Sequence, residues 1–312
     1  MSKVAVVGGA GFIGTQTCIE LILNKHDVTV IDLVRSNVPL VKSMIADATD
    51  YNQLYRALDN DFDYVYMFAA VSDSSENIRS PLYSINQNIV GLANVLQAVK
   101  DLKIGRIIFS STVWVYSVAE QRHVDEQTDL IITNSDHLYT TSKITCETLI
   151  RNYHESYGIN YTILRYGIAY GPGCHPDTIL SKFMTNALHN KPLIITGNGT
   201  ISRNFLNVAD HARGNVAAMG LAAENQIINL EGPEKITLAR VADRVRQLHA
   251  GDVNVIYTDQ RPGDYEGKIV SNLKSKKLMD WAPTVSFNTG TQEMYNYLKH
   301  KHDENTSNSS TC

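Results

Sequence analysis

Three side chains of this 312-residue chain can together remove a proton from an alcohol: Thr112, Tyr139 and Lys143. Tyr139 and Lys143 are four residues apart, so they share one face if this segment is a helix. A free tyrosine loses its proton only near pH 10, but a neighbouring ammonium favours the phenolate and lowers that pKa. Thr112 can hydrogen-bond the same substrate oxygen and stabilise the charge that develops on it. A Tyr/Lys pair at this spacing also arises by chance, so the catalytic interpretation depends on the surrounding elements.

A glycine-rich turn near the N-terminus supplies that context. Residues 4–7 are a β-branched run typical of a buried strand, and residues 15–24 carry apolar side chains at helical spacing. Between them Gly8 permits a tight turn, Gly11 lets the backbone approach a pyrophosphate, and Gly14 allows close helix packing. The N-terminus of the helix offers its N–H groups to phosphates. The pattern predicts a dinucleotide site.

An acidic residue completes this motif. A second apolar run, residues 28–31, ends in Asp32. A carboxylate at the end of the second strand can accept both ribose hydroxyls of an adenosine and repels a 2′-phosphate. Asp32 therefore favours NAD over NADP, although Arg35 lies close by in the sequence.

Beyond Asp32, strand and helix patterns alternate, which predicts an α/β fold with a Rossmann-type, doubly wound parallel sheet. The predicted strands are 43–46, 64–68, 106–110 and 161–164, and the predicted helices are 51–58, 82–99 and 137–157. We predict an NAD-binding domain over residues 1–165 and a smaller C-terminal α/β substrate-binding region over 166–300, part of which returns to the sheet. Residues 301–312 are polar and predict a disordered tail.

The composition and charge of the chain limit the kinds of partner that we expect. The chain is 43% hydrophobic and 19% charged with a net charge of −4 and no long basic run, so we expect neither nucleic acid nor a membrane as a partner. The first strand begins at once, which leaves no room for a signal peptide, and no apolar run is long enough for a membrane span. The four cysteines are scattered, which predicts no metal site and a reduced, cytoplasmic protein.

Further motifs follow in order along nearly the whole chain, and the set resembles an extended short-chain dehydrogenase/reductase of the NAD-dependent sugar-nucleotide epimerase/dehydratase family, similar to UDP-glucose 4-epimerases. The motifs are G-G-A-G-F-I-G at 8–14, F-A-A at 68–70, N-I-V-G at 88–91, S-S-T at 110–112, Y-x-x-x-K at 139–143, R-Y at 165–166, Y-G-P at 170–172, R-N-F at 203–205 and R-P-G-D at 261–264. The resemblance implies NAD as cofactor, a nucleoside-diphosphate sugar as substrate and a homodimer.

The resemblance also implies roles for single residues. Asp47 would contact the adenine, and Asn88 would brace the strand ends near the cofactor. Arg203 and Arg261 would hold the nucleotide diphosphate, with Asp264 orienting Arg261; paired guanidiniums suit that anion. The predicted cofactor-binding set is Gly8, Gly11, Phe12, Ile13, Gly14, Asp32, Asp47, Ala48, Phe68, Ala69, Ala70, Asn88, Ser110, Tyr139, Lys143 and Tyr166, and the predicted substrate-binding set is Ser72, Thr112, Arg203, Arg261 and Asp264.

Two positions after Thr112 bear on the reaction. Dehydratases of the family that act at C4 and C6 carry an acidic pair, or at least a glutamate, directly after the catalytic threonine, whereas this chain has Val113 and Trp114. Neither side chain can move a proton, which disfavours hexose dehydration by that route. Reductase–epimerases resembling fucose synthase use a Cys/His pair near the sugar, and Cys146 and His137 are not in those places.

The remaining set predicts an NAD-dependent epimerase. It would oxidise C4 of the sugar with Tyr139 as base, assisted by Lys143 and Thr112, and return the hydride to the other face of the 4-keto sugar. Two departures from the family pattern leave the substrate open. Ile168 replaces the usual asparagine after the R-Y pair, and the acidic loop 71–77 lacks the lysine of some 4-epimerases.

Three alternatives stand beside this prediction. A dehydratase or 4-keto reductase of the same family uses the same cofactor site. A non-catalytic sensor of NAD(H) or a nucleotide would typically lose the tyrosine or the lysine, and this chain keeps both. The third alternative is a reductase that acts on non-nucleotide alcohols, and Arg203 and Arg261 argue against it.

The helices predicted at 82–99 and 137–157 are candidates for the homodimer interface.

Overall fold

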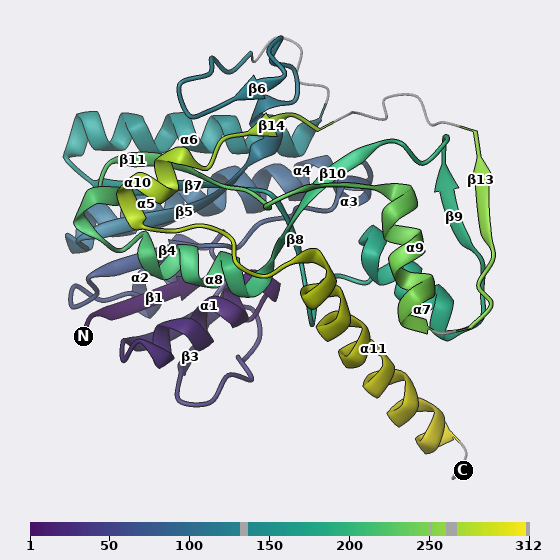
Figure 1. Cartoon of the computed structure of the whole chain (residues 1–312). Helices are drawn as coiled ribbons and strands as arrows, with labels where there is room; N and C mark the ends of the chain where they lie inside the picture. The colour runs from purple at the N-terminus through teal and green to yellow at the C-terminus, as the bar shows by residue number, and fades with distance from the viewer. Residues whose placement is uncertain (132–136, 250, 260–266, 310–312) are drawn as a thin grey trace. The chain divides into compact units, whose positions relative to one another are not determined.

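The computed structural model of the chain (Figure 1) describes residues 1–131, 137–249, 251–259 and 267–309. The chain folds into two compact units. The first unit comprises Met1–Gly167, His211–Glu231 and Lys268–Ala282, and the second comprises Ile168–Asp210, Gly232–Gly267 and Pro283–Cys312. No helix within the described ranges is long and apolar enough to cross a membrane.

A seven-stranded sheet forms the centre of the first unit. Its strands run in the order β11-β7-β5-β4-β1-β2-β3, and every neighbouring pair is parallel. The strands are β1 (Lys3–Val7), β2 (Asp27–Asp32), β3 (Lys42–Ile45), β4 (Tyr64–Met67), β5 (Arg106–Thr112), β7 (Asn160–Tyr166) and β11 (Gln226–Leu230). The predicted doubly wound parallel sheet is confirmed. The chain order reverses between β1 and β4, the place where such sheets bind ligands beyond the carboxyl ends of their strands.

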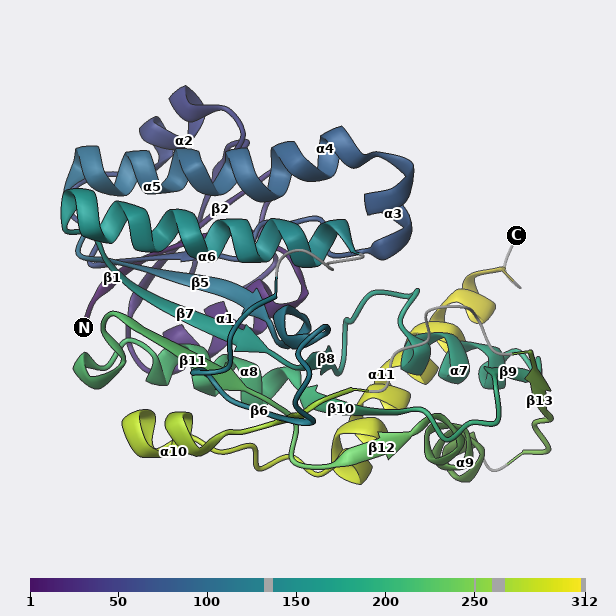
Figure 2. The same cartoon turned by 90° about the horizontal axis from the view of Figure 1, so that it is seen from above.

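Helices cover both faces of this sheet (Figure 2). Side chains of α2, α5 and α6 form one core cluster with the strands, including Leu54, Leu92, Leu96, Cys146 and Ile150, while α1 and α8 lie on the opposite face. The elements outside the large sheet are α1 (Phe12–Leu23), α2 (Tyr51–Ala57), α3 (Ser74–Arg79), α4 (Pro81–Ile85), the π-helical turn η1 (Asn86–Val90), α5 (Gly91–Leu102), the 3-10 turn η2 (Val113–Tyr116), α6 (Leu138–Tyr157), α8 (Val208–Ala217), the 3-10 turn η3 (Leu221–Ala223), α10 (Leu273–Met279) and the short pair β6 (His123–Val124) with β14 (Ile269–Val270).

Two predicted segments of the first unit differ in the structure. The predicted helix 82–99 is present as one helical run formed by α4, η1 and α5, but its middle, η1, is a π-helical turn rather than regular α-helix. The loop 71–77 turns into α3 at Ser74, since the Asp73 carboxylate accepts a hydrogen bond from Glu76 N at 2.8 Å. An aspartate three residues before a glutamate is a known helix-start signal, so this turn was readable from the sequence.

The second unit has its own small sheets and core. Its elements are β8 (Ile168–Tyr170), α7 (Ile179–Leu188), β9 (Leu193–Thr196), β10 (Ser202–Asn207), β12 (Lys235–Thr237), α9 (Leu238–His249), β13 (Val255–Thr258) and α11 (Phe287–Ser309). β12, β10 and β8 form one sheet and β13 pairs with β9. Phe183, Phe205, Val241 and Met294 belong to its buried cluster.

The structure continues α11 through residues 301–309, which the sequence predicts to be part of a disordered tail. Met294 and Tyr295 bury their side chains in the core of the second unit and fix the helix before the polar segment begins. Once a helix is nucleated, each further residue adds a hydrogen bond at little entropic cost.

Candidate active site

The glycine turn of the first unit is built for close backbone contacts. Gly8 has φ +83°, and a Cβ there would lie 2.3 Å from Ala69 N. A Cβ at Gly14 would lie 2.3 Å from the Gly8 carbonyl oxygen, so α1 can pack on the turn only with glycine at that position. Gly11 is the N-cap of α1 and offers no side-chain oxygen to the first-turn amides. Such a helix start is suited to bind an anion.

The Asp32 carboxylate is held at the end of β2. Its Oδ2 accepts a hydrogen bond from Ala10 N at 3.0 Å, and its Oδ1 accepts one from Leu33 N at 2.7 Å. Both donors are backbone groups, one from the glycine turn and one from the residue that follows the strand. These backbone hydrogen bonds orient the carboxylate at the sheet edge.

A cavity of about 340 Å³ opens at this edge. Eight of the predicted cofactor-binding residues line it: Gly8, Gly11, Asp32, Asp47, Ala48, Phe68, Ala69 and Ala70. The sequence reasoning missed other lining residues, among them Leu33, Val34, Val71, Tyr83 and Gln87. Leu33 and Val34 directly follow the diagnostic Asp32 and could have been found from it. Tyr83 and Gln87 reach the cavity from α4 and η1, which only the fold reveals.

Lys143 joins α6 to β5. Its side chain is 3% exposed, and its Nζ donates a hydrogen bond to the Ser110 carbonyl oxygen at 2.6 Å. The same Nζ lies 4.6 Å from the centre of the Phe109 ring and 5.7 Å from the centre of the Tyr139 ring. Thr112, which is 4% exposed, ends β5 two residues beyond Ser110. The structure thus brings Lys143, Tyr139 and the end of β5 together. Phe109, whose ring lies beside Lys143, was not predicted as a site residue, because nothing in the sequence distinguishes it from a core residue.

Burial shifts both titratable groups toward their neutral forms. It lowers the pKa of Lys143 to about 8, although the Cys146 thiol and the Glu147 carboxylate act in the opposite direction. Burial also raises the pKa of Tyr139 well above its ordinary value, with a smaller contribution from Cys146. In the described structure the phenol is therefore protonated near neutral pH, and its use as a base requires further positive charge beside it.

Asn88 connects the cavity to α6. Its Oδ1 accepts a hydrogen bond from Val71 N at 2.7 Å, and its Nδ2 donates to the Val71 carbonyl oxygen at 3.1 Å and to Ser142 Oγ at 3.2 Å. Asn88 lies in η1, and π-helical turns of this kind frequently occur at functional sites. One side chain thus links a residue of the cavity lining to the residue that precedes Lys143.

The remaining predicted residues are dispersed. Ser72 is exposed, and the Tyr166 hydroxyl donates to Asn215 Oδ1 in the interior of the first unit. Arg203 lies on β10 of the second unit, where its Nη1 donates to the Ser202 carbonyl oxygen at 2.9 Å. Arg261 and Asp264 fall outside the described residues. Phe12, Ile13, Gly14, Asn88, Ser110, Tyr139, Lys143 and Tyr166 are not part of the cavity lining.

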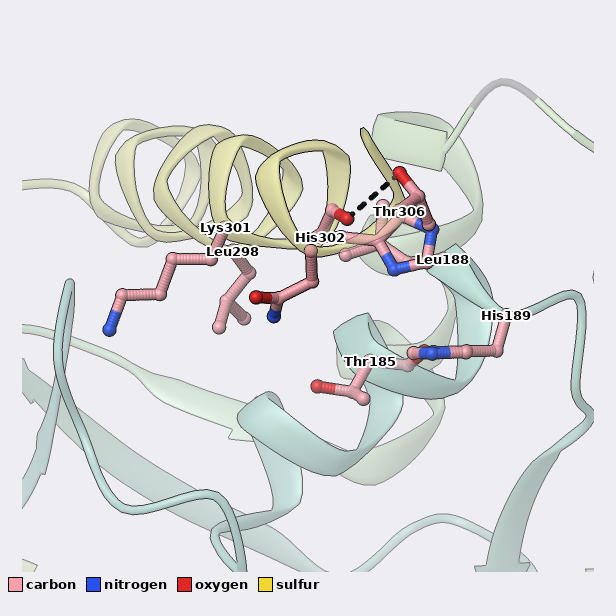
Figure 3. A pocket seen from close by; sticks show the side chains of 8 residues that line it. Thr185, Leu188, His189, Leu298, Lys301, His302 and Thr306 are labelled. Carbon is pink, nitrogen blue, oxygen red and sulfur yellow. Dashed lines mark hydrogen bonds between the residues drawn. The ribbon is translucent and has the colours of Figure 1, made fainter. Parts of the chain in front are cut away.

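A second cavity, of about 410 Å³, lies between α7 and α11 of the second unit (Figure 3). The edge-to-face pair His189 and His302 lines it, with ring centres 4.7 Å apart. Thr306 also lines the cavity, and its hydroxyl donates to the His302 carbonyl oxygen at 3.1 Å. None of the predicted site residues lines this cavity, so the candidate site is the edge of the large sheet.

Comparisons with known proteins agree with this geometry. A putative UDP-glucose 4-epimerase of Methanocaldococcus jannaschii is 28% identical over 95% of this chain and 98% of its own length. A UDP-N-acetyl-alpha-D-glucosaminuronate decarboxylase of Bacillus cytotoxicus is 28% identical over 94% of this chain and 97% of its own.

A solved structure is similarly close. The UDP-glucuronic acid 4-epimerase of Bacillus cereus, in complex with UDP-glucuronic acid and NAD, superimposes with a TM-score of 0.86 and 27% identity over 96% of this chain and 99% of the other. Residues 4–230 match the family of NAD dependent epimerases and dehydratases. The chain therefore belongs to the NAD dependent epimerase/dehydratase family.

Proposed function

We propose that this protein is an NAD-dependent nucleotide-sugar epimerase that inverts C4 through a transient 4-keto-sugar nucleotide. The observation that carries the proposal is the hydrogen bond from Lys143 Nζ to the Ser110 carbonyl oxygen at 2.6 Å. It holds the face of α6 that bears Tyr139 against the end of β5, where Thr112 lies. This arrangement supports a role for Tyr139 in removing a proton from a sugar hydroxyl.

NAD is the family's cofactor, and the first unit has a place that fits it. The glycine turn, where a Cβ at Gly8 or Gly14 would collide with backbone, would hold the diphosphate against the start of α1. Asp32 would accept the ribose hydroxyls and Asp47 would contact the adenine; both line the cavity. When bound, NAD supplies the hydride acceptor and, after the sugar has turned over, the hydride donor.

The protein's own residues would handle the proton. Tyr139 would take it from the C4 hydroxyl, and Thr112 would hold the same oxygen. Because burial raises the pKa of Tyr139, the phenolate needs the Lys143 ammonium and the positive charge of the oxidised nicotinamide beside it. Tyr139 would return the proton when the 4-keto group is reduced from the other face.

The residues after Thr112 favour epimerisation over elimination. η2 begins there with Val113 and Trp114, and Trp114 N donates to Thr112 Oγ1 at 3.2 Å. Neither side chain can remove a proton at C5 or transfer one to a leaving hydroxyl. Dehydration, 4-keto reduction and the decarboxylation named for one relative are the competing reactions, and a sensor without turnover is the competing class.

We further propose that Arg203, Arg261 and Asp264 hold the nucleotide diphosphate and that the protein is a homodimer. Exposed apolar side chains on the predicted interface helices support the dimer, since Leu82 is 82% and Tyr157 is 56% exposed. Light scattering coupled to size exclusion would test it: a mass near twice the 34.7 kDa of one chain is expected, and a monomer at micromolar concentration contradicts it.

The activity is tested by incubating the purified protein, without added cofactor, with UDP-, dTDP-, GDP- and CDP-sugars, including a hexuronic acid. Products are read by mass and proton NMR, with Tyr139→Phe as the matched control. A new sugar of unchanged mass that the control does not form is expected. A product lighter by one water, a product lighter by carbon dioxide, or no product from any sugar would each contradict the epimerase.

A further inference from the structure

A buried ion pair lies one helical turn beyond Lys143. Glu147 on α6 is 1% exposed, and Arg165 on β7 is 2% exposed. Arg165 Nε donates to Glu147 Oε1 at 3.0 Å, and Nη2 donates to Oε2 at 2.7 Å. Burying two charges carries a large desolvation cost, and a well-packed apolar pair is often as stable. Stability alone is therefore a weak reason for this pair.

The pair ties α6 to three neighbouring strands. In the sheet register Arg165 lies opposite Ser111 of β5 and opposite Asn229 of β11. Ser111 Oγ donates to Glu147 Oε1, and Arg165 Nη1 donates to the Tyr116 hydroxyl at 2.7 Å. That hydroxyl donates in turn to Asn229 Oδ1 at 2.9 Å. All the polar groups of the network find partners, which makes it a rigid connection.

The network shares its elements with the proposed catalytic residues. Tyr139, Lys143 and Glu147 follow one another at four-residue spacing on α6 and so lie along one face. On β5, the Ser110 carbonyl oxygen accepts the hydrogen bond from Lys143, and the Ser111 hydroxyl donates one to Glu147. Thr112 is the next residue of the strand. A slip of α6 by one residue along β5 would displace Tyr139 by about 1.5 Å.

We propose that Glu147 and Arg165 are positioning residues that fix Tyr139 and Lys143 relative to Thr112. This inference rests on the proposed function. The groups that face Lys143 are Tyr139, Cys146 and Glu147 from α6 and the Phe109 ring and Ser110 carbonyl from β5.

The pKa values of Lys143 and Cys146 add an electrostatic argument for the role of Glu147. Burial lowers the pKa of Lys143 to about 8, and the Glu147 carboxylate counteracts that shift. Burial also raises the pKa of Cys146 to about 12, so its thiol is neutral near pH 7. The neighbour of Lys143 that counteracts burial within the network is therefore Glu147, whose carboxylate accepts two hydrogen bonds from Arg165.

The test replaces the pair by an apolar one, Glu147→Met with Arg165→Met, so that no buried charge is left alone. With the nucleotide sugar that the wild type converts, we expect retained NAD, a Tm lowered by no more than about 10 °C, and a KM within about threefold. We expect kcat to fall about 100-fold, the order of loss that follows a misplacement of 1 Å. The alkaline limb of the kcat profile should move to lower pH.

The matched control breaks another ion pair on the same strand. Arg106, at the opposite end of β5, donates to Glu224 Oε2 at 2.6 Å. Glu224→Gln should lower the Tm while leaving kcat and the pH profile unchanged. A methionine pair with kcat within about threefold of the wild type and the same pH profile overturns the proposal. Loss of bound NAD together with a collapsed Tm also overturns it, because the pair would then be structural.

A readout that needs no sugar separates this proposal from the proposed function. The phenolate absorbance of Tyr139 is titrated in the NAD-bound protein as the difference from a Tyr139→Phe counterpart. The methionine pair should raise the pKa of Tyr139. If the titration curves of the wild type and the methionine pair superimpose, the positioning role is refuted. A wild type that converts no nucleotide sugar refutes the epimerase but leaves this titration decisive for the pair.

Discussion

Replacing Lys143 by methionine should make the stability of the protein depend differently on pH. Burial lowers the pKa of Lys143 from 10.5 to about 8. The unfolded chain therefore binds more protons than the folded chain between these two values, and the stability of the wild type rises with pH across that window. This shift in the pKa of Lys143 lowers the free energy of unfolding by about 3 kcal/mol below pH 8, and the effect disappears above pH 10.5.

The Lys143→Met variant lacks this penalty at every pH but loses the hydrogen bond to the Ser110 carbonyl oxygen. An unpartnered buried carbonyl costs about 1–3 kcal/mol, independent of pH. Near pH 7 the variant should therefore be as stable as the wild type or up to about 2 kcal/mol more stable. Near pH 10 it should be less stable, and it should be inactive throughout.

Urea unfolding monitored by tryptophan fluorescence measures this difference. Both tryptophans, Trp114 and Trp281, lie in the first unit with Lys143, so the signal reports on the correct part of the chain. All other groups titrate in both proteins and cancel in the comparison. Lys277→Met, at an exposed lysine of α10, is the reference for removal of a lysine charge. A difference between variant and wild type that stays constant from pH 7 to pH 10 refutes the assigned burial of the Lys143 charge.

Four further predictions concern single residues. Tyr139→Phe should retain NAD and lose about 10²–10⁴-fold in kcat; activity near that of the wild type would remove Tyr139 from the role of base. Asp32→Ala should weaken NAD about tenfold or more in a titration of the apoprotein, as expected when charge-assisted hydrogen bonds are lost, and unchanged affinity would place the ribose elsewhere. Gly8→Ala should destabilise the protein by at least about 1–3 kcal/mol in thermal unfolding, because its φ is +83°; an unchanged Tm would contradict the strained turn. Arg261→Ala should raise the KM for the nucleotide sugar with little change in kcat, and an unmoved KM would reject the diphosphate role.

The sequence was sufficient where structure is decided locally. Residues 4–7 and 28–31 are buried strands because they are apolar and β-branched, and Gly8 and Asp32 mark the ends of those strands. Parallel pairing then follows from the alternation of strands and helices. This was enough to predict the sheet, eight residues that line the cavity at its edge, and the placement of Lys143 and Tyr139 on one helix face.

The failures come from long-range contacts. The π-helical turn within the predicted helix 82–99 contains Asn88, whose partners Val71 and Ser142 are distant in sequence. Nothing in residues 86–90 alone indicates a π-helical turn. In the sequence, Glu147 likewise looks like an ordinary helix residue. Its ion pair with Arg165 forms only because the fold places β7 beside α6. Side chains whose role is to connect elements cannot be recognised before the elements are placed.

The proposed role of Lys143 opposes the stability of the folded protein. A buried ammonium weakens the folded state near neutral pH, yet only the charged form favours the Tyr139 phenolate. Burial pushes the two groups toward a neutral phenol and a neutral amine, which is the unreactive combination. The Glu147 carboxylate counteracts the lowering of the Lys143 pKa. The proposed binding of a positively charged nicotinamide would counteract the raising of the Tyr139 pKa. The base would therefore be competent only with the oxidised cofactor in place, so proton removal would be coupled to the presence of the hydride acceptor.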